Sequence, residues 1–160
     1  MNEHKIKYFL DVAKTISKQS KCKRRKFGVV ITSQDGVIKS TGYNGSVRGA
    51  KNCGENVCLK DLMNEPHYKS YNYCPAVHAE ENSIINAARE GISIKNGILF
   101  LNSAQDGDCE RPCQKCRRTI INAGIEDCYF VDKENKIVHE KVSSWIEMEN
   151  EFMNDIKNKK

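Results

Sequence analysis

Two short segments place side chains that bind metals at the predicted starts of two helices. The first, "HAEENSIINAAREG", begins with His78 and Glu80, and its apolar residues recur at helical spacing up to a glycine stop. The second, "PCQKCRRTIINAG", begins with Cys113 and Cys116 and also ends at a glycine. The apolar run "GILFLN" between them predicts a buried strand. A fold that uses both segments together must bring two helix starts to one place on a sheet.

The rest of the chain predicts the remaining layers. Apolar residues from Ile6 to Ile16 follow helical spacing, and "KFGVVITSQDGVIKSTGYNG" predicts an antiparallel hairpin with its turn at Asp35-Gly36. The segment from Ser46 to Val77 shows little periodicity, so something else must hold it in place. Further predicted elements are helices over 79–90, 113–123 and 143–157 and strands over 97–102, 126–131 and 137–142. This order predicts one domain over residues 1–160, a three-layer α/β fold with a central mixed sheet.

His78, Cys113 and Cys116 supply three ligands of the kinds that zinc prefers, and a catalytic zinc site keeps its fourth position for water. The two cysteines lie three residues apart, so their thiols share one helix face, and the positive end of the helix favours the thiolate. Glu80 lies two residues from His78 and is placed to act on that water. A structural zinc site or a set of buried thiols is the alternative, but neither has a use for Glu80.

The composition limits the classes of protein that fit. Charged residues make up 29% and the net charge is +5, which suits a soluble chain with a phosphate-bearing ligand, although lysines near the end of the chain contribute to it. No apolar run is long enough to span a bilayer, and the first residues lack a signal-peptide pattern, so we expect a cytoplasmic protein and no membrane partner. Eight cysteines in such a chain indicate metal binding before disulfides.

The combination His-x-Glu with Pro-Cys-x-x-Cys resembles the signature of zinc-dependent nucleobase deaminases. In this interpretation zinc lowers the pKa of its bound water to about 7, and the resulting hydroxide attacks C4 of a cytosine. Glu80 accepts the water proton, delivers it to the ring nitrogen and then carries a proton to the departing amino group, which leaves as ammonia. We expect Glu81 to face solvent.

A narrower resemblance covers roughly Ser20 to Val131. The stretches "GVVITSQDGVIKSTGYNGSVRG", "HAEENSIINAAREG" and "PCQKCRRTIINAGIEDCYF" resemble the deoxycytidylate (dCMP) deaminase family. The resemblance implies a cytidine-deaminase-like fold and a hydrolase that converts dCMP to dUMP and ammonia. It also implies that Asn44, within Gly-Tyr-Asn-Gly, holds the deoxyribose and that Ala79 lies at the substrate. A homo-oligomer regulated by dCTP and dTTP would accord with the family.

A nucleotide substrate needs donors for its phosphate. The candidates are the basic residues that flank the predicted hairpin, namely Arg24, Arg25, Lys26 and Arg48. Any one of them could instead face solvent. As a set they favour a nucleotide over an uncharged nucleoside.

Four other cysteines, Cys22, Cys53, Cys58 and Cys74, resemble the ligands of a second, structural zinc site in some members of this family. Four thiolates would tie down the long segment after the hairpin. Reduced thiols are the alternative, and Cys109 is a rival ligand. Cys128, inside a predicted strand, is expected to be a small core residue.

Two other functions stay open at this point. The longer stretch "NSAQDGDCERPC" before the second helix is compatible with a deaminase of a related nucleotide, nucleoside or base. A zinc-stabilised nucleic-acid-binding module is compatible with the charge and the cysteines. Aromatic residues, however, make up only 8% and are scattered, so that module would lack a surface for stacking bases.

Overall fold

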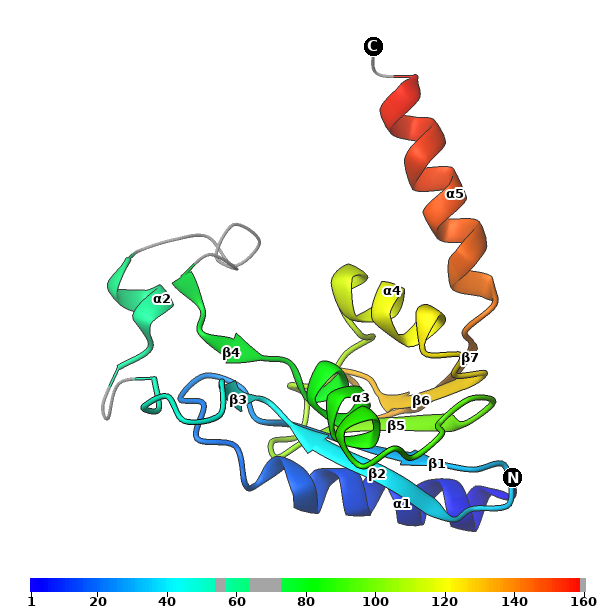
Figure 1. The fold of residues 1–160 in the computed structure, drawn as a ribbon, viewed down its shortest axis with the longest axis horizontal. Coiled ribbons are helices and arrows are strands. Elements are labelled where there is room, and N and C mark those ends of the chain that lie inside the picture. Colours follow the sequence, from blue (N-terminus) through cyan, green and yellow to red (C-terminus); the bar gives the residue numbers. More distant parts are fainter. Residues whose placement is uncertain (54–56, 64–72, 159–160) are drawn as a thin grey trace.

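A computed structural model describes residues 1–53, 57–63 and 73–158. Five strands form a mixed sheet in the order β2-β1-β5-β6-β7 (Figure 1). They are β1 (Phe27–Thr32), β2 (Ile38–Tyr43), β5 (Ile98–Ser103), β6 (Asp127–Val131) and β7 (Ile137–Lys141). β5 and β6 run parallel, and each of the other neighbouring pairs runs antiparallel. The predicted mixed sheet is therefore confirmed.

Helices cover both faces of this sheet. Helix α1 (Glu3–Ser17) packs on one face through Phe9, Leu10 and Ala13, which meet apolar side chains of β1 and β5. Helices α3 (Ala79–Arg89) and α4 (Gln114–Asn122) lie on the other face, over a second and larger apolar core (Figure 1). Strands β1 and β5 contribute to both cores and are buried almost throughout. The three-layer α/β/α prediction is confirmed.

The hairpin and the helix boundaries follow the sequence pattern closely. Strands β1 and β2 pair antiparallel, and Gly36 in their turn has a positive φ of 95°, which glycine adopts at little cost. The two helices on the face opposite α1 begin and end within about a residue of the predicted positions, because their caps and glycine stops are local signals.

The segment between β2 and α3 contains little regular structure, as its weak periodicity predicts. Strands β3 (Gly45–Ser46) and β4 (Ala76–Val77) form a short antiparallel ribbon, and α2 (Leu59–Leu62) is a single helical turn. Residues 54–56 and 64–72 lie outside the described part of the chain. The ribbon leads directly into α3, so it fixes the direction from which His78 enters the site.

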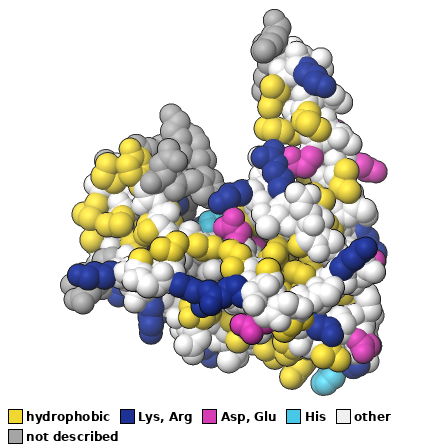
Figure 2. Space-filling model, viewed as in Figure 1, with side chains coloured by type: hydrophobic (Ala, Val, Ile, Leu, Met, Phe, Trp, Pro, Cys, Tyr) yellow, Lys and Arg dark blue, Asp and Glu magenta, His cyan; other side chains and the backbone are white. Residues whose placement is uncertain are grey.

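The final helix, α5 (Ser144–Lys157), leaves the sheet after β7 and projects away from the body of the protein (Figure 1). Its first turn is anchored by Trp145, which is 1% exposed. Farther along, Phe152, Met153 and Ile156 are exposed, and hydrophobic side chains gather along this helix (Figure 2). No helix in the described ranges is long and apolar enough to cross a membrane.

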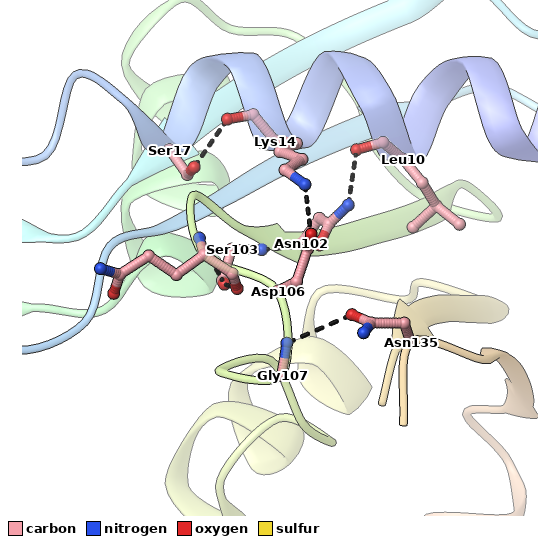
Figure 3. A network of polar contacts seen from close by, with 9 residues as sticks. Leu10, Lys14, Ser17, Asn102, Ser103, Asp106, Gly107 and Asn135 are labelled. Atoms are coloured by element: carbon pink, nitrogen blue, oxygen red, sulfur yellow. Dashed lines mark hydrogen bonds and ion pairs between the residues drawn. The ribbon is translucent and has the colours of Figure 1, made fainter. Parts of the chain in front are cut away.

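Polar contacts fix the connection that follows β5 and leads to α4 (Figure 3). Lys14 Nζ of α1 lies 2.5 Å from Asp106 Oδ1, and the amide of Gly107 donates to Asn135 Oδ1 at 3.2 Å. The buried Asn102 Nδ2, in β5, donates to the Leu10 carbonyl at 3.1 Å. The longer loop seen in the sequence is therefore held from α1 and from the β6–β7 turn before it reaches Pro112.

Candidate active site and metal centre

Two helix starts supply the metal-binding side chains. His78 is the N-cap residue of α3, and Cys113 is the N-cap residue of α4. The Cys113 sulfur accepts a hydrogen bond from the amide of Cys116 at 3.5 Å, so the thiol occupies the position that a capping oxygen usually takes. The unpaired N–H groups and the positive end of α4 both favour negative charge on this sulfur.

The three predicted ligands lie together. Their ligand atoms all fall within 4.8 Å of one another, and His78 Nδ1 lies 3.6 Å from Cys113 Sγ and 3.3 Å from Cys116 Sγ. Typical zinc–nitrogen and zinc–sulfur bond lengths in a tetrahedral site place such atoms about 3.6 Å apart. The donor set and its spacing therefore fit zinc.

The acid–base properties of these groups also favour the binding of a cation. A hydrogen bond from the Cys116 thiol to Cys113, together with burial, raises the pKa of the Cys116 thiol well above its usual range. The hydrogen bond with Cys113 also raises the pKa of the His78 imidazole, despite its burial. Two adjacent thiolates are costly in a buried site without a positive partner, and a divalent cation supplies that partner.

Glu80 lies in the first turn of α3 and is only 6% exposed. Burial raises the pKa of its carboxyl above the ordinary value, because desolvation disfavours the charged form. The residue lines the same cavity as His78 and Cys113. A buried carboxyl with a raised pKa, next to a metal-binding cluster, is suited to accepting and returning protons.

Glu81 does not face solvent, so that prediction was wrong. Its side chain is 16% exposed, and Oε1 lies 3.1 Å from Lys115 Nζ of α4. Oε2 accepts a hydrogen bond from the His78 amide at 3.4 Å, which completes a capping box at the start of α3. The carboxylate three residues after the N-cap was the sequence signal for this role. Glu81 therefore joins the starts of α3 and α4.

Strand β2 fixes the height of α3 above the sheet. A Cβ added to Gly42 would lie 2.4 Å from the Ser83 amide nitrogen and 2.5 Å from the Ala79 carbonyl. The buried Ser40 Oγ donates to the Ser83 carbonyl at 2.6 Å. Gly42 lies within β2, where its missing side chain lets α3 approach.

A cavity of about 220 Å³ opens beside the metal-binding cluster. His78, Ala79, Glu80 and Cys113 line it, together with Asn44. Ala79 is fully buried. Asn44 Oδ1 accepts from the Phe27 amide at 2.8 Å, and its Nδ2 donates to the Arg25 carbonyl at 2.9 Å. The Asn44 side chain thus holds the start of β1 while lining the cavity.

The structure separates the predicted phosphate-binding residues into two groups. Arg24 and Arg25 line the cavity, where Arg24 lies 3.4 Å from Asp61 and Arg25 lies 3.1 Å from Glu110. Lys26 is not among the residues that line it. Arg48 lies along a different groove beside α3, where it contacts Asn86.

Two basic residues that the sequence reasoning did not single out, Lys60 and Arg111, also line the cavity. Arg111 comes directly before the Pro-Cys-x-x-Cys motif, so its proximity to Cys113 was a usable signal. Lys60 lies in α2, inside the segment with weak periodicity, and no local pattern points to it.

The other cysteines also separate into residues that line the cavity and residues that do not. Cys22, Cys58 and Cys74 line the same cavity, whereas Cys53 does not. Within residues 1–53, 57–63 and 73–158, the His78 cluster is the one set of three or more such ligand atoms within 4.8 Å of one another. Cys109 is buried near the Leu101 carbonyl, and burial raises the pKa of its thiol to about 12. Cys128 is a fully buried core residue of β6.

A three-layer α/β fold with a His-Cys-Cys cluster beside a buried glutamate defines the class of zinc-binding nucleobase deaminases. A family model described as "cytidine and deoxycytidylate deaminase zinc-binding region" matches residues 3–132, which is most of the chain. The chain therefore belongs to the cytidine and deoxycytidylate deaminase family.

Named relatives agree with this membership. The chain is 33% identical over 132 residues to a deoxycytidylate deaminase of Schizosaccharomyces pombe, covering 82% of this chain but only 38% of that protein. It is 32% identical over 124 residues to a deoxycytidylate deaminase of Mycobacterium phage D29, covering 74% of this chain and 88% of that protein. The chain thus spans well under half of the yeast relative and most of the phage relative.

Solved structures share the fold. The dCMP deaminase of cyanophage S-TIM5 in complex with dCMP and dUMP superposes with a TM-score of 0.61 at 25% identity, covering 81% of this chain and 82% of that one. A cytidine deaminase of Burkholderia pseudomallei superposes with the same TM-score, 0.61, at 15% identity, covering 90% of this chain and 95% of that one. The second likeness concerns the fold alone.

Proposed function

We propose that this protein is a zinc-dependent hydrolase that converts dCMP and water to dUMP and ammonia. The observation that carries the proposal is the buried Glu80 beside the His78, Cys113 and Cys116 cluster, in one cavity. Two relatives named deoxycytidylate deaminase and a similar solved structure in complex with dCMP and dUMP support the choice of substrate.

The division of roles follows from the geometry. His78, Cys113 and Cys116 hold zinc, which when bound acts as a Lewis acid that activates water at neutral pH. Glu80 accepts a proton from the attacking water and delivers it to N3 of the cytosine. It then carries the proton of the hydroxyl group added at C4 to the amino group, which leaves as ammonia. A carboxyl whose pKa is raised by burial is suited to both steps, because it accepts a proton more readily than an ordinary carboxylate does. Glu81 holds the two helix starts in register.

The cavity is suited to an anionic ligand. Among the residues that the structure describes, four basic ones line it, Arg24, Arg25, Lys60 and Arg111, against the carboxyl groups of Glu80 and Glu110. Arg24 and Arg25, which were expected to contact phosphate, remain candidates for that role. A charge-assisted hydrogen bond contributes about 1.5–3 kcal/mol, so dCMP should exceed deoxycytidine in kcat/KM by about tenfold to a hundredfold.

The test is ammonia release by the zinc-loaded protein with dCMP, CMP, dCTP, deoxycytidine and guanine as separate substrates. We expect the highest kcat/KM with dCMP. Equal rates for dCMP and deoxycytidine would contradict phosphate recognition. A preference for another nucleotide or for guanine would favour the alternative of a related deaminase.

We also propose a second, structural zinc held by Cys22, Cys53, Cys58 and Cys74. Three of these residues, Cys22, Cys58 and Cys74, line one cavity, which supports a shared partner, and Cys58 and Cys74 belong to the weakly structured segment. The prediction is two zinc ions per chain by metal analysis. Cys58→Ser should lower the zinc content to one and reduce thermal stability, because metal binding contributes to folding. One zinc per chain in the unmodified protein, purified without chelator, would refute this site. If Cys109 replaced one of the four cysteines as a ligand, only the proposed set of ligands would change.

Other expectations also remain proposals. They are a single domain over residues 1–160, a cytoplasmic location, a homo-oligomeric state, and regulation by dCTP and dTTP. Ultracentrifugation with and without these nucleotides tests the last two together.

A further inference from the structure

Arg111 lines the cavity and is held by a carboxylate from another part of the chain. Its Nε and Nη2 atoms both donate to Glu140 Oε1 of β7, at 2.8 and 2.5 Å. Both donors lie on one edge of the guanidinium group. In the part of the chain that the structure describes, Nη1 has no hydrogen-bond partner, and the side chain is 41% exposed. One edge of Arg111 is therefore anchored and another remains available.

Glu140 is itself fixed. Its other oxygen, Oε2, accepts a hydrogen bond from the indole Nε1 of Trp145 at 2.6 Å, and the glutamate side chain is only 14% exposed. Trp145 is 1% exposed and packs in the larger apolar core. A series of hydrogen bonds therefore runs from the core to the cavity, from Trp145 through Glu140 to Arg111. A charged hydrogen bond to a partly buried acceptor holds its donor in one orientation.

This arrangement differs from that of the neighbouring Arg25. The partner of Arg25 is Glu110, which itself lines the cavity and also lies 2.9 Å from Lys133. A ligand therefore meets the negative charge of Glu110 together with the positive charge of Arg25. Glu140 is not among the residues that line the cavity, so the cavity meets Arg111 without its carboxylate partner. Such an arginine favours an anion.

We propose that Glu140 is a positioning residue that, with Trp145, orients Arg111 so that its remaining edge binds the phosphate group of the nucleotide. The inference rests on the proposed function for the identity of the ligand. Glu140 and Trp145 lie outside residues 3–132, the range that the family model matches. The C-terminal strand and helix of this chain therefore contribute to substrate recognition, although they lie behind the cavity wall.

The test measures binding of dUMP and deoxyuridine to the zinc-loaded full chain by isothermal titration calorimetry. Arg111→Ala should raise the Kd for dUMP about tenfold or more, as loss of a charge-assisted hydrogen bond predicts, and leave the Kd for deoxyuridine unchanged. Glu140→Gln keeps the shape of the side chain but removes its charge, and should weaken dUMP binding about threefold to tenfold. Glu134→Gln, which alters an exposed ion pair with Lys136 on the same hairpin, is the matched control and should change neither Kd.

The double variant separates positioning from a general structural effect. If Glu140 acts through Arg111, Glu140→Gln adds no further loss of dUMP affinity to Arg111→Ala. Additive losses, or equal losses for dUMP and deoxyuridine, would overturn the proposal. Failure of the unmodified protein to release ammonia from dCMP would refute the proposed function instead, and the dUMP titrations would still decide the role of Glu140.

Discussion

Replacing Gly42 by alanine tests whether the approach of α3 to β2 sets the position of the active site. The added Cβ would lie 2.4 Å from the Ser83 amide nitrogen, whereas an ordinary contact begins at 3.4 Å, so α3 must move by about 1 Å. His78 caps this helix and Glu80 lies in its first turn, whereas Cys113 belongs to the start of α4 and would not move with them. A misplacement of about 1 Å lowers catalysis about a hundredfold. Overpacking also costs about 1–3 kcal/mol of stability, or roughly 3–10 °C in Tm.

The assay is kcat/KM for dCMP, with zinc content and Tm measured on the same samples. Gly28→Ala is the matched control, because its Cβ would lie 2.1 Å from the Ala13 carbonyl of α1, on the opposite face of the sheet. It should lower Tm at least as much as Gly42→Ala but retain most of the activity below its Tm. Gly45→Ala, whose Cβ has its nearest neighbour at 4.0 Å, should change neither property. Full activity in folded Gly42→Ala, or equal losses in Gly28→Ala, would refute the reasoning.

Three further predictions concern the metal, the proton carrier and a buried carboxylate. Glu80→Gln should keep its zinc but lower kcat at least about a hundredfold, because the proposed function gives the carboxyl the role of moving protons; loss of zinc would contradict this role. Removing zinc with a chelator should abolish turnover and lower Tm, and adding zinc back should restore both. Although burial alone raises the pKa of Asp127, its ion pair with Lys141 and its hydrogen bond with His139 hold that pKa below the ordinary value of 3.8. Ionised Asp127 therefore stabilises the folded state at neutral pH, and this stabilisation is lost as the pH falls through the lowered pKa. Asp127→Asn should lower the free energy of unfolding by about 1–3 kcal/mol at neutral pH, measured by urea denaturation, and by little well below pH 3.8. An equal loss at both pH values would point to packing instead.

The sequence predicted the elements and the metal-binding cluster because both depend on local signals. His78 and Cys113 stand where helix caps belong, and the periodic residues after them require two helices on one face of a sheet. Gly36 marks the hairpin turn through its positive φ. Such features can be predicted from a few neighbouring residues.

The lining of the cavity could not be predicted in the same way. Arg48 and Arg25 are both basic residues near the hairpin, yet Arg25 lines the cavity beside His78 and Arg48 lines a different groove beside β3 and α3. Arg111 depends on Glu140, which pairs with it only after β7 joins β6. Tertiary contacts of this kind are set by the strand order of the whole sheet, which no short segment encodes.

The strand order also affects how the chain emerges during synthesis. Val29, Val30 and Ile31 of β1 are completely buried in the finished sheet, between α1 on one side and α3 on the other. Their central neighbour, β5, follows only after β2, the weakly structured segment and all of α3. Until β5 leaves the ribosome, one edge of β1 is unpaired and its apolar side chains are only partly covered. The nascent N-terminal half is therefore the aggregation-prone stage of biosynthesis, and the stage at which a chaperone would bind.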